Sequence, residues 1–247
     1  MYDATASTGE ALVRPTLTAR IVDTSALAER DVEAMYSLLG RHFLGVDPHT
    51  FRRDLSEKNW VVLLEDNSGR LRGFSTFLIY ATTACGWPMT VVYSGDTIVE
   101  PAAWGSPVLP RAWIRAIYDI ARDYPAGDLY WLLLTSGFRT YRFVSVFCRR
   151  FFPRCDARTP PEFQRILDAL SVERFGSAYD ADSGLVRFSR PQVLRARLRG
   201  VPDGRSADPH VQFFLERNPG HVQGDELVSL ASLAPENLTA AGRRMLR

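Results

Sequence analysis

Residues 89–124 read MTVVYSGDTIVEPAAWGSPVLPRAWIRAIYDIARDY, and their pattern predicts a strand, a loop and a helix in succession. Its first part, residues 89–100, is a long apolar run that is typical of a strand. A short loop with Gly105 follows, and residues 107–124 then have the pattern of an amphipathic helix. Such a loop favours phosphate binding, because backbone N–H groups and the positive end of a helix converge there. Pro107 and Pro110, however, remove two N–H groups from it.

Composition restricts the class of protein. The chain has 247 residues, 46% of them hydrophobic, which is enough for one sizeable core. Its net charge of +2 gives no general attraction to nucleic acid or to a membrane. No apolar run approaches the roughly 20 residues of a membrane span, and the N-terminus does not resemble a signal peptide. We therefore expect a soluble cytoplasmic protein.

Cysteine and histidine content argues against two further kinds of site. Three cysteines lie far apart in the sequence, which does not indicate a disulfide framework. The four histidines do not have the spacing of metal ligands, and no cysteine pair accompanies them. We therefore expect no metal site.

The order of predicted elements indicates an α/β fold with a mixed, mostly antiparallel sheet. Residues 1–16 are expected to form a flexible arm, residues 17–153 the core, and residues 154–247 a C-terminal extension. The pattern predicts core strands at 18–23, 60–65, 71–81, 89–100 and 128–135, and core helices at 26–43, 49–55, 107–124 and 140–152. In the extension it predicts a helix at 162–174, strands at 184–189 and 210–216, and a terminal helix at 237–246.

In this element order, and in the residues Ile98, Val99, Glu100 and Pro101 at a strand end, the chain resembles the GNAT superfamily of acyl-CoA-dependent acyltransferases. The resemblance covers residues 18–152, with 184–216 supplying the last two strands. It implies that the fourth and fifth strands separate to admit the pantetheine arm of coenzyme A.

Two short motifs of the superfamily are incomplete in this sequence. The pyrophosphate motif Arg/Gln-x-x-Gly-x-Gly/Ala aligns with Ala102, Gly105 and Pro107, so that only Gly105 fits. A tyrosine that often protonates the leaving thiolate aligns with Phe147, which has no hydroxyl group. The resemblance implies that the donor thioester lies near Val99, with cofactor contacts from the loop residues Ala103, Trp104, Gly105 and Ser106. A different interpretation of this loop is that Ser106 caps the following helix and Pro107 begins it.

Two carboxylates on the long strand are candidates for the general base. Asp96 and Glu100 are four residues apart, so a regular strand directs both to one face. Apolar neighbours would raise the pKa of a carboxyl group there, which suits proton abstraction from an amine. Glu100 is the leading candidate, because the superfamily commonly uses a glutamate near this place. The alternatives are a solvated strand end for Glu100 and a bulge at Gly95 that redirects Asp96.

Tyr141 is the candidate acid, because it lies in the first turn of a predicted helix and could protonate the thiolate in place of the missing tyrosine. The alternative for Tyr141 is a half-buried aromatic side chain with its hydroxyl group in water. Two arginine clusters, around residues 149–158 and 190–199, suit a phosphate, the acidic surface of an acyl carrier protein, or solvent.

The sequence as a whole predicts an acyltransferase. It would move an acyl group from acyl-CoA, or from an acyl carrier protein thioester, to an amine or hydroxyl of a small molecule by direct attack, in a setting such as specialised metabolism. The extension would shape the acceptor pocket or a homodimer contact. Two alternatives stay open, namely a non-catalytic GNAT-like binding module and a fold reused for decarboxylation or hydrolysis of a thioester.

Overall fold

The computed structural model describes residues 16–124 and 127–247, so nearly all of the expected N-terminal arm lies outside the described residues. The N-terminal half contains β1 (Leu17–Asp23), α1 (Glu29–His42), β2 (Phe43–Leu44), α2 (Pro48–Ser56), β3 (Trp60–Asp66), β4 (Leu71–Ala84), β5 (Trp87–Val99), α3 (Val108–Ile120), β6 (Asp128–Thr135) and α4 (Phe138–Phe147). The remainder contains β7 (Phe151–Phe152), α5 (Pro161–Phe175), β8 (Tyr179–Asp180), β9 (Leu185–Val186), β10 (Val193–Leu194), α6 (Ala196–Arg199), α7 (Pro209–Arg217), β11 (Glu226–Ser232) and α8 (Ala240–Leu246).

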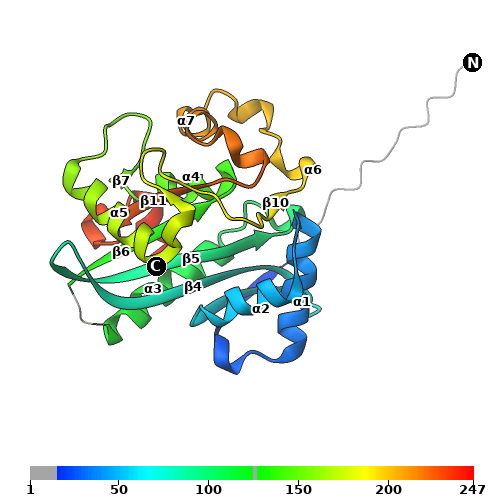
Figure 1. The fold of residues 1–247 in the computed structure, drawn as a ribbon. Coiled ribbons are helices and arrows are strands. Elements are labelled where there is room, and N and C mark those ends of the chain that lie inside the picture. Colours follow the sequence, from blue (N-terminus) through cyan, green and yellow to red (C-terminus); the bar gives the residue numbers. More distant parts are fainter. Residues whose placement is uncertain (1–15, 125–126) are drawn as a thin grey trace, which may run out of the picture.

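One mixed sheet organises the molecule, as the sequence predicted. Its strand order is β1-β3-β4-β5-β6-β11-β9-β8, and β7 pairs with β11. Only β5 and β6 pair in parallel, and α3 makes the crossover between them; the other described pairs are antiparallel. Figure 1 shows the long β4–β5 hairpin running across the molecule. The expected fold class, a mostly antiparallel mixed sheet flanked by helices, is confirmed.

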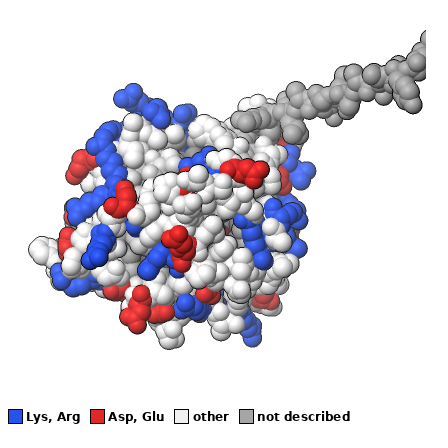
Figure 2. Space-filling model, turned by 90° about the horizontal axis from the view of Figure 1, so that it is seen from above, with Lys and Arg blue, Asp and Glu red and all other residues white. Residues whose placement is uncertain are grey.

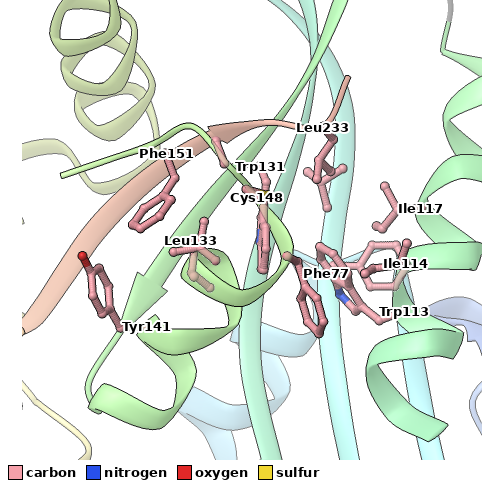
Figure 3. Packing of buried hydrophobic residues seen from close by; sticks show 14 of the residues in the cluster. Phe77, Trp113, Ile114, Ile117, Trp131, Leu133, Tyr141, Cys148, Phe151 and Leu233 are labelled. Atoms are coloured by element: carbon pink, nitrogen blue, oxygen red, sulfur yellow. The ribbon is translucent and has the colours of Figure 1, made fainter. Parts of the chain in front are cut away.

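Helices cover both faces of the sheet. On one face, α3, α4, α7 and α8 pack on a core in which the Trp113 and Trp131 rings lie 4.7 Å apart and Phe77 meets Trp113 edge-on at 6.2 Å (Figure 3). On the other face, α1 and α2 cover β3, β4 and the end of β5, while α5 covers β5, β6 and β11. Alternation along each strand supplies apolar side chains to both faces.

The prediction of a strand at residues 210–216 was wrong, since this segment lies in helix α7. Pro209 occupies the first turn, and the Asp208 carboxylate accepts the N–H of His210 at 3.0 Å, which is ordinary helix-start chemistry. Val211 and Phe214, three residues apart, are both fully buried on the core. The last long strand is instead β11, which lies beside β6 in the centre of the sheet.

Two further element boundaries differ from the prediction. The helix expected at residues 140–152 ends at Phe147, because Cys148 is extended and Phe152 pairs with Leu230 of β11. Asn237 fixes the backbone after α4, since its side chain accepts the N–H of Arg150 and donates to the carbonyl oxygen of the same residue. In the segment 184–189, only Leu185 and Val186 form a strand. Core and extension therefore share one sheet.

Candidate active site

The parallel pair β5–β6 opens part of the way along its length. Pairing runs from Met89–Asp128 to Ser94–Leu133 and stops there. Immediately afterwards the β4–β5 register shifts, so that Gly95 and Asp96 together face Thr76. This is a β-bulge, which bends the strand that contains it. A Cβ at Gly95 would lie 2.5 Å from the Thr76 hydroxyl oxygen, so the bulge requires glycine.

A cavity of about 480 Å³ lies at the open end of this strand pair. This volume falls within the range of small-molecule sites. The end of β5, the following loop and the first turns of α3 and α4 line it, and residues 194–205 and His221 contribute further lining. All five residues expected to contact the donor line this cavity, namely Val99, Ala103, Trp104, Gly105 and Ser106. The structure therefore brings the predicted donor residues together.

The loop offers few free amides to a phosphate. The N–H groups of Ala103, Trp104 and Ser106 donate to carbonyl oxygens within the loop or at its start. The Ser106 hydroxyl accepts the N–H of Val108, the first residue of α3, at 3.3 Å. Of the four loop amides that were expected to hold the donor, only that of Gly105 has no bond in the described residues. Ser106 therefore does bond the start of α3, but the prediction that it is the cap and that Pro107 begins the helix was wrong by one residue, since Pro107 is the N-cap and α3 begins at Val108.

The amide of Val99 points into the opening between β5 and β6. Trp104 Nε1 donates to the Val99 carbonyl oxygen at 2.8 Å, so this carbonyl points away from β4. In an antiparallel pair, opposed residues exchange either both backbone bonds or neither, so the N–H of Val99 points away from β4 as well. The N–H of Glu100 donates to Arg72 on the β4 side, in keeping with this alternation. Val99 can therefore present a strand amide to a carbonyl oxygen in the cavity.

Glu100 does not have the properties that were expected of a base. Its carboxylate accepts hydrogen bonds from Arg72 at 2.8 Å and from Arg41 at 3.0 Å, and Arg70 lies 3.8 Å away. Burial alone raises the pKa of Glu100, but the arginines outweigh burial and the pKa is lowered. Glu100 is also absent from the cavity lining. The expected rise in its pKa is therefore wrong, and the carboxylate joins β5 to β4 and α1.

Asp96 has the raised pKa that the sequence predicted. Burial is the main cause and brings the pKa of Asp96 to about 6, while the positive charge of Lys58 lowers this pKa in part. Its interactions with Lys58 and Asp54 place it toward α2, on the face that also carries Glu100. Burial likewise raises the pKa of Glu226 to about 8, with the charge of Asp96 adding to this rise. Sequence inspection missed Glu226, because β11 was not recognised as a central strand.

Tyr141 cannot serve as the expected acid in this arrangement. Its side chain is fully buried, and its hydroxyl donates to the Pro153 carbonyl oxygen at 3.0 Å. Burial raises its pKa well above the ordinary value, and the residue does not line the cavity. Figure 3 shows Tyr141 directed toward Phe151 inside the core, so its interpretation as a half-buried side chain is also wrong. Phe147, at the position of the missing tyrosine, does line the cavity.

The charges at the cavity were not visible in the sequence. Among its described lining residues, no aspartate or glutamate occurs, whereas four arginines do: Arg139, Arg142, Arg199 and Arg205. His42 also lines it, and its Nδ1 donates to the Leu38 carbonyl oxygen at 3.0 Å. His42 Nε2 is closed to solvent and has no partner among the described residues. These side chains come from segments far apart in the chain. The only one of these arginines that the sequence places at the start of a helix is Arg139, which follows Gly137 and Phe138.

The second predicted arginine cluster has mainly a structural role. Arg195 donates to the carbonyl oxygen of Gly40, and Arg197 to that of Arg41, at the end of α1. Cationic donors there satisfy the free carbonyls of a helix C-terminus. On the face shown in Figure 2, basic and acidic side chains are interspersed. Within the described residues, no histidine, cysteine and carboxylate group is arranged to hold a metal, and no helix has the length and apolarity to cross a membrane.

Comparison with known proteins finds no matching family model and no matching curated protein. Among solved structures, the chain is similar to a GNAT family N-acetyltransferase from Escherichia coli in complex with CoA, at 18% identity and a TM-score of 0.37, over 54% of this chain and 70% of that chain. An acetyltransferase from Trypanosoma brucei matches at 18% identity and a TM-score of 0.38, over 59% and 97%. A probable N-acyltransferase from Enterococcus faecalis matches at 13% identity and a TM-score of 0.40, over 54% of this chain and only 33% of its own length.

Proposed function

We propose that the protein transfers an acyl group from an acyl-CoA thioester to an amine or hydroxyl group of a small molecule. The observation that carries the proposal is the separation of β5 from β6 beyond Ser94 and Leu133, which opens onto the lined cavity. Because the Val99 amide points into this opening, a thioester carbonyl placed there has a donor for the negative charge that develops during attack. No covalent enzyme intermediate is required.

Asp96 is the proposed base for this reaction in place of Glu100; like Glu100 it does not line the cavity, so the proton reaches it through water. A carboxyl group with a pKa of about 6 is ionised at neutral pH and close enough in pKa to accept a proton effectively. The attacking amine gives its proton to Asp96 through water, as its nitrogen bonds to the thioester carbon. The C–S bond then breaks, and the sulfur leaves with the bonding electrons as the thiolate of the donor.

The side chains at the cavity favour binding of an anionic donor, whereas the backbone of the loop contributes little to it. Arginines and the absence of carboxylates among the described lining residues suit the phosphates of coenzyme A. The loop, with three of its amides engaged, supplies little of the usual backbone cradle. A carrier-protein thioester is therefore a second donor, whose protein surface would supply affinity. The same loop, together with Phe147, also favours the alternative of a non-catalytic ligand-binding module.

Binding and turnover test the proposal separately. Thermal shift with CoA, acetyl-CoA and longer acyl-CoAs should stabilise the protein, since a ligand that binds only the folded state raises the melting temperature. Mass spectrometry of a panel of amines and alcohols incubated with the binding donor should then show acylated product. Binding without product in any combination would favour the non-catalytic module, and no binding of any CoA species would contradict the CoA-dependent enzyme.

Asp96→Asn tests the base. The variant should bind donor normally but lower kcat by roughly 100-fold or more, the usual contribution of a general base. Because Asn removes the group that titrates, the fall in rate at acid pH should also disappear. An unchanged rate in Asp96→Asn would remove Asp96 from the mechanism while leaving the proposed reaction in place.

A further inference from the structure

The guanidinium of Arg139 is held rigidly at the cavity wall. Its Nη1 donates to the Leu198 carbonyl oxygen at 2.6 Å, and its Nη2 donates to the Gly200 carbonyl oxygen at 3.0 Å. Its Cζ lies 4.5 Å from the ring centroid of Trp104 and 4.6 Å from that of Phe138. Two hydrogen bonds and two aromatic rings therefore fix the position of the cationic group.

This cation has no anionic partner. In the described part of the chain, no carboxylate lies within ion-pair distance of Arg139, and burial lowers its pKa. A guanidinium has five N–H donors, and only two of those of Arg139 are accounted for by the two carbonyl oxygens. A partly buried cation without a counter-ion is unfavourable, so a bound anion would stabilise this arrangement.

The surroundings leave the positive charge of Arg139 uncompensated at this point. Arg142, one helical turn further along α4, is neutralised by Asp208 at 2.9 Å, which leaves Arg139 as the uncompensated arginine of that helix at the cavity. Arg139 lies in the first turn of α4, where the helix dipole also favours an anion. A planar guanidinium fork with free N–H groups matches the planar, singly charged carboxylate.

We propose that Arg139 binds a carboxylate on the small-molecule part of the reaction, either on the transferred acyl group or on the acceptor. This inference rests on the proposed function and narrows its substrate class. Dicarboxylic acyl thioesters and amino or hydroxy acids carry such a group, whereas acetyl-CoA and simple amines do not. The phosphates of the donor are then held elsewhere in the cavity.

Titration calorimetry with the full-length chain tests this assignment. Ligands are CoA, acetyl-CoA and succinyl-CoA for the acyl source, and succinate and a panel of amino acids, with and without CoA, for the acceptor source. Variants are Arg139→Gln, Arg139→Lys, which keeps the charge but not the fork, and Arg115→Gln, an exposed arginine on α3, as the matched control. Circular dichroism and melting temperature establish that each variant is folded.

We expect at least one carboxylate ligand to bind the wild type roughly tenfold more tightly than its counterpart without the carboxylate. Arg139→Gln should abolish this carboxylate preference and leave CoA affinity within about twofold. Arg139→Lys should keep only part of the carboxylate preference, and Arg115→Gln should keep all of it. Equal weakening of CoA and of carboxylate ligands in Arg139→Gln would assign the residue to a phosphate and overturn the proposal. Absence of any carboxylate preference in the wild type would overturn it too.

The outcome is separable from that of the proposed function. If the wild type binds no CoA species but binds a carboxylate ligand through Arg139, the acyl-CoA reaction fails and the carboxylate site stands. If CoA binds and product forms without any effect of Arg139, the reaction stands and the carboxylate site fails.

Discussion

Trp104 and Val99 are joined by a hydrogen bond from the indole Nε1 to the strand carbonyl oxygen at 2.8 Å. This bond ties the loop after β5 to the strand end and places the indole where Arg139 stacks on it at 4.5 Å. Trp104 is 38% exposed, so its position follows from these contacts rather than from burial in the core.

Trp104→Phe removes that hydrogen bond and keeps an aromatic ring. We expect donor affinity to fall by roughly three- to tenfold, because the loop loses its tie to the end of β5, while the free energy of unfolding changes by about 1 kcal/mol or less. Calorimetry and chemical denaturation measure the two quantities. Trp87→Phe, at the exposed first residue of β5, is the control and should change neither. A large loss of stability in Trp104→Phe would show that the indole supports the fold instead of the site.

Glu100→Gln should affect stability more than catalysis. Its carboxylate is bonded by Arg72 and Arg41, the second of which is 43% exposed, so solvent screening limits the loss to about 1 kcal/mol. Because these partners lower the pKa of Glu100, their stabilisation is present above the ordinary glutamate pKa and is lost as the pH falls through the folded-state value. The stability gap between wild type and variant should therefore narrow as the pH is lowered from 6 toward 3. A kcat reduced 100-fold with normal stability would restore Glu100 as the base.

Glu226→Gln should stabilise the protein at alkaline pH. The folded-state pKa of about 8 lies above the ordinary glutamate value, so the folded state holds a proton that the unfolded chain has lost. Wild-type stability therefore falls as the pH rises from about 4.5 through 8, whereas Gln stays neutral throughout. Each pKa unit is worth about 1.4 kcal/mol, so we expect the variant to gain up to about 4–5 kcal/mol at pH 9 and less than about 1 kcal/mol at pH 5. Glu216→Gln, at an exposed position on α7, is the control. A gain in stability that does not depend on pH would contradict the raised pKa of Glu226.

The three cysteines should react at very different rates with a thiol reagent. Cys85 is exposed at the β4–β5 turn, Cys155 is half-buried, and Cys148 is 1% exposed with a pKa raised by burial to about 12. Reaction needs the thiolate and access to it. Mass spectrometry of the native protein should therefore find Cys85 labelled first, Cys155 more slowly, and Cys148 only after unfolding. Early labelling of Cys148 would show that the α4 face of the core opens readily.

Local patterns were sufficient to predict most of the fold. The continuous apolar runs of β3 and β6 gave the right elements, since a strand that is buried on both faces is apolar at nearly every position. The segment of α7 was not predicted correctly, because its apolar residues fit the period of a helix and that of a strand equally well. These residues are Val211, Phe213, Phe214 and Leu215. The deciding feature was the start signal Asp208-Pro209, which favours a helix.

The candidate site could be predicted only in part, for a similar reason. The donor-facing residues from Val99 to Ser106 are contiguous in sequence, so their common location follows from the strand-loop-helix pattern. The pKa of Glu100 could not be predicted, since it depends on Arg41, which is 59 residues away along the chain. Likewise Arg139 meets Leu198 and Gly200 only through the path of the extension. Long-range contacts of this kind leave no local pattern.

Hydrogen exchange with and without acetyl-CoA, read by mass spectrometry, tests whether a thioester donor occupies the opening between β5 and β6. We predict slower exchange in residues 97–109 and 136–143, where the cavity is lined, and unchanged exchange in α5 and β8, which lie away from it. Protection confined to other segments, or no protection at saturating donor, would contradict it.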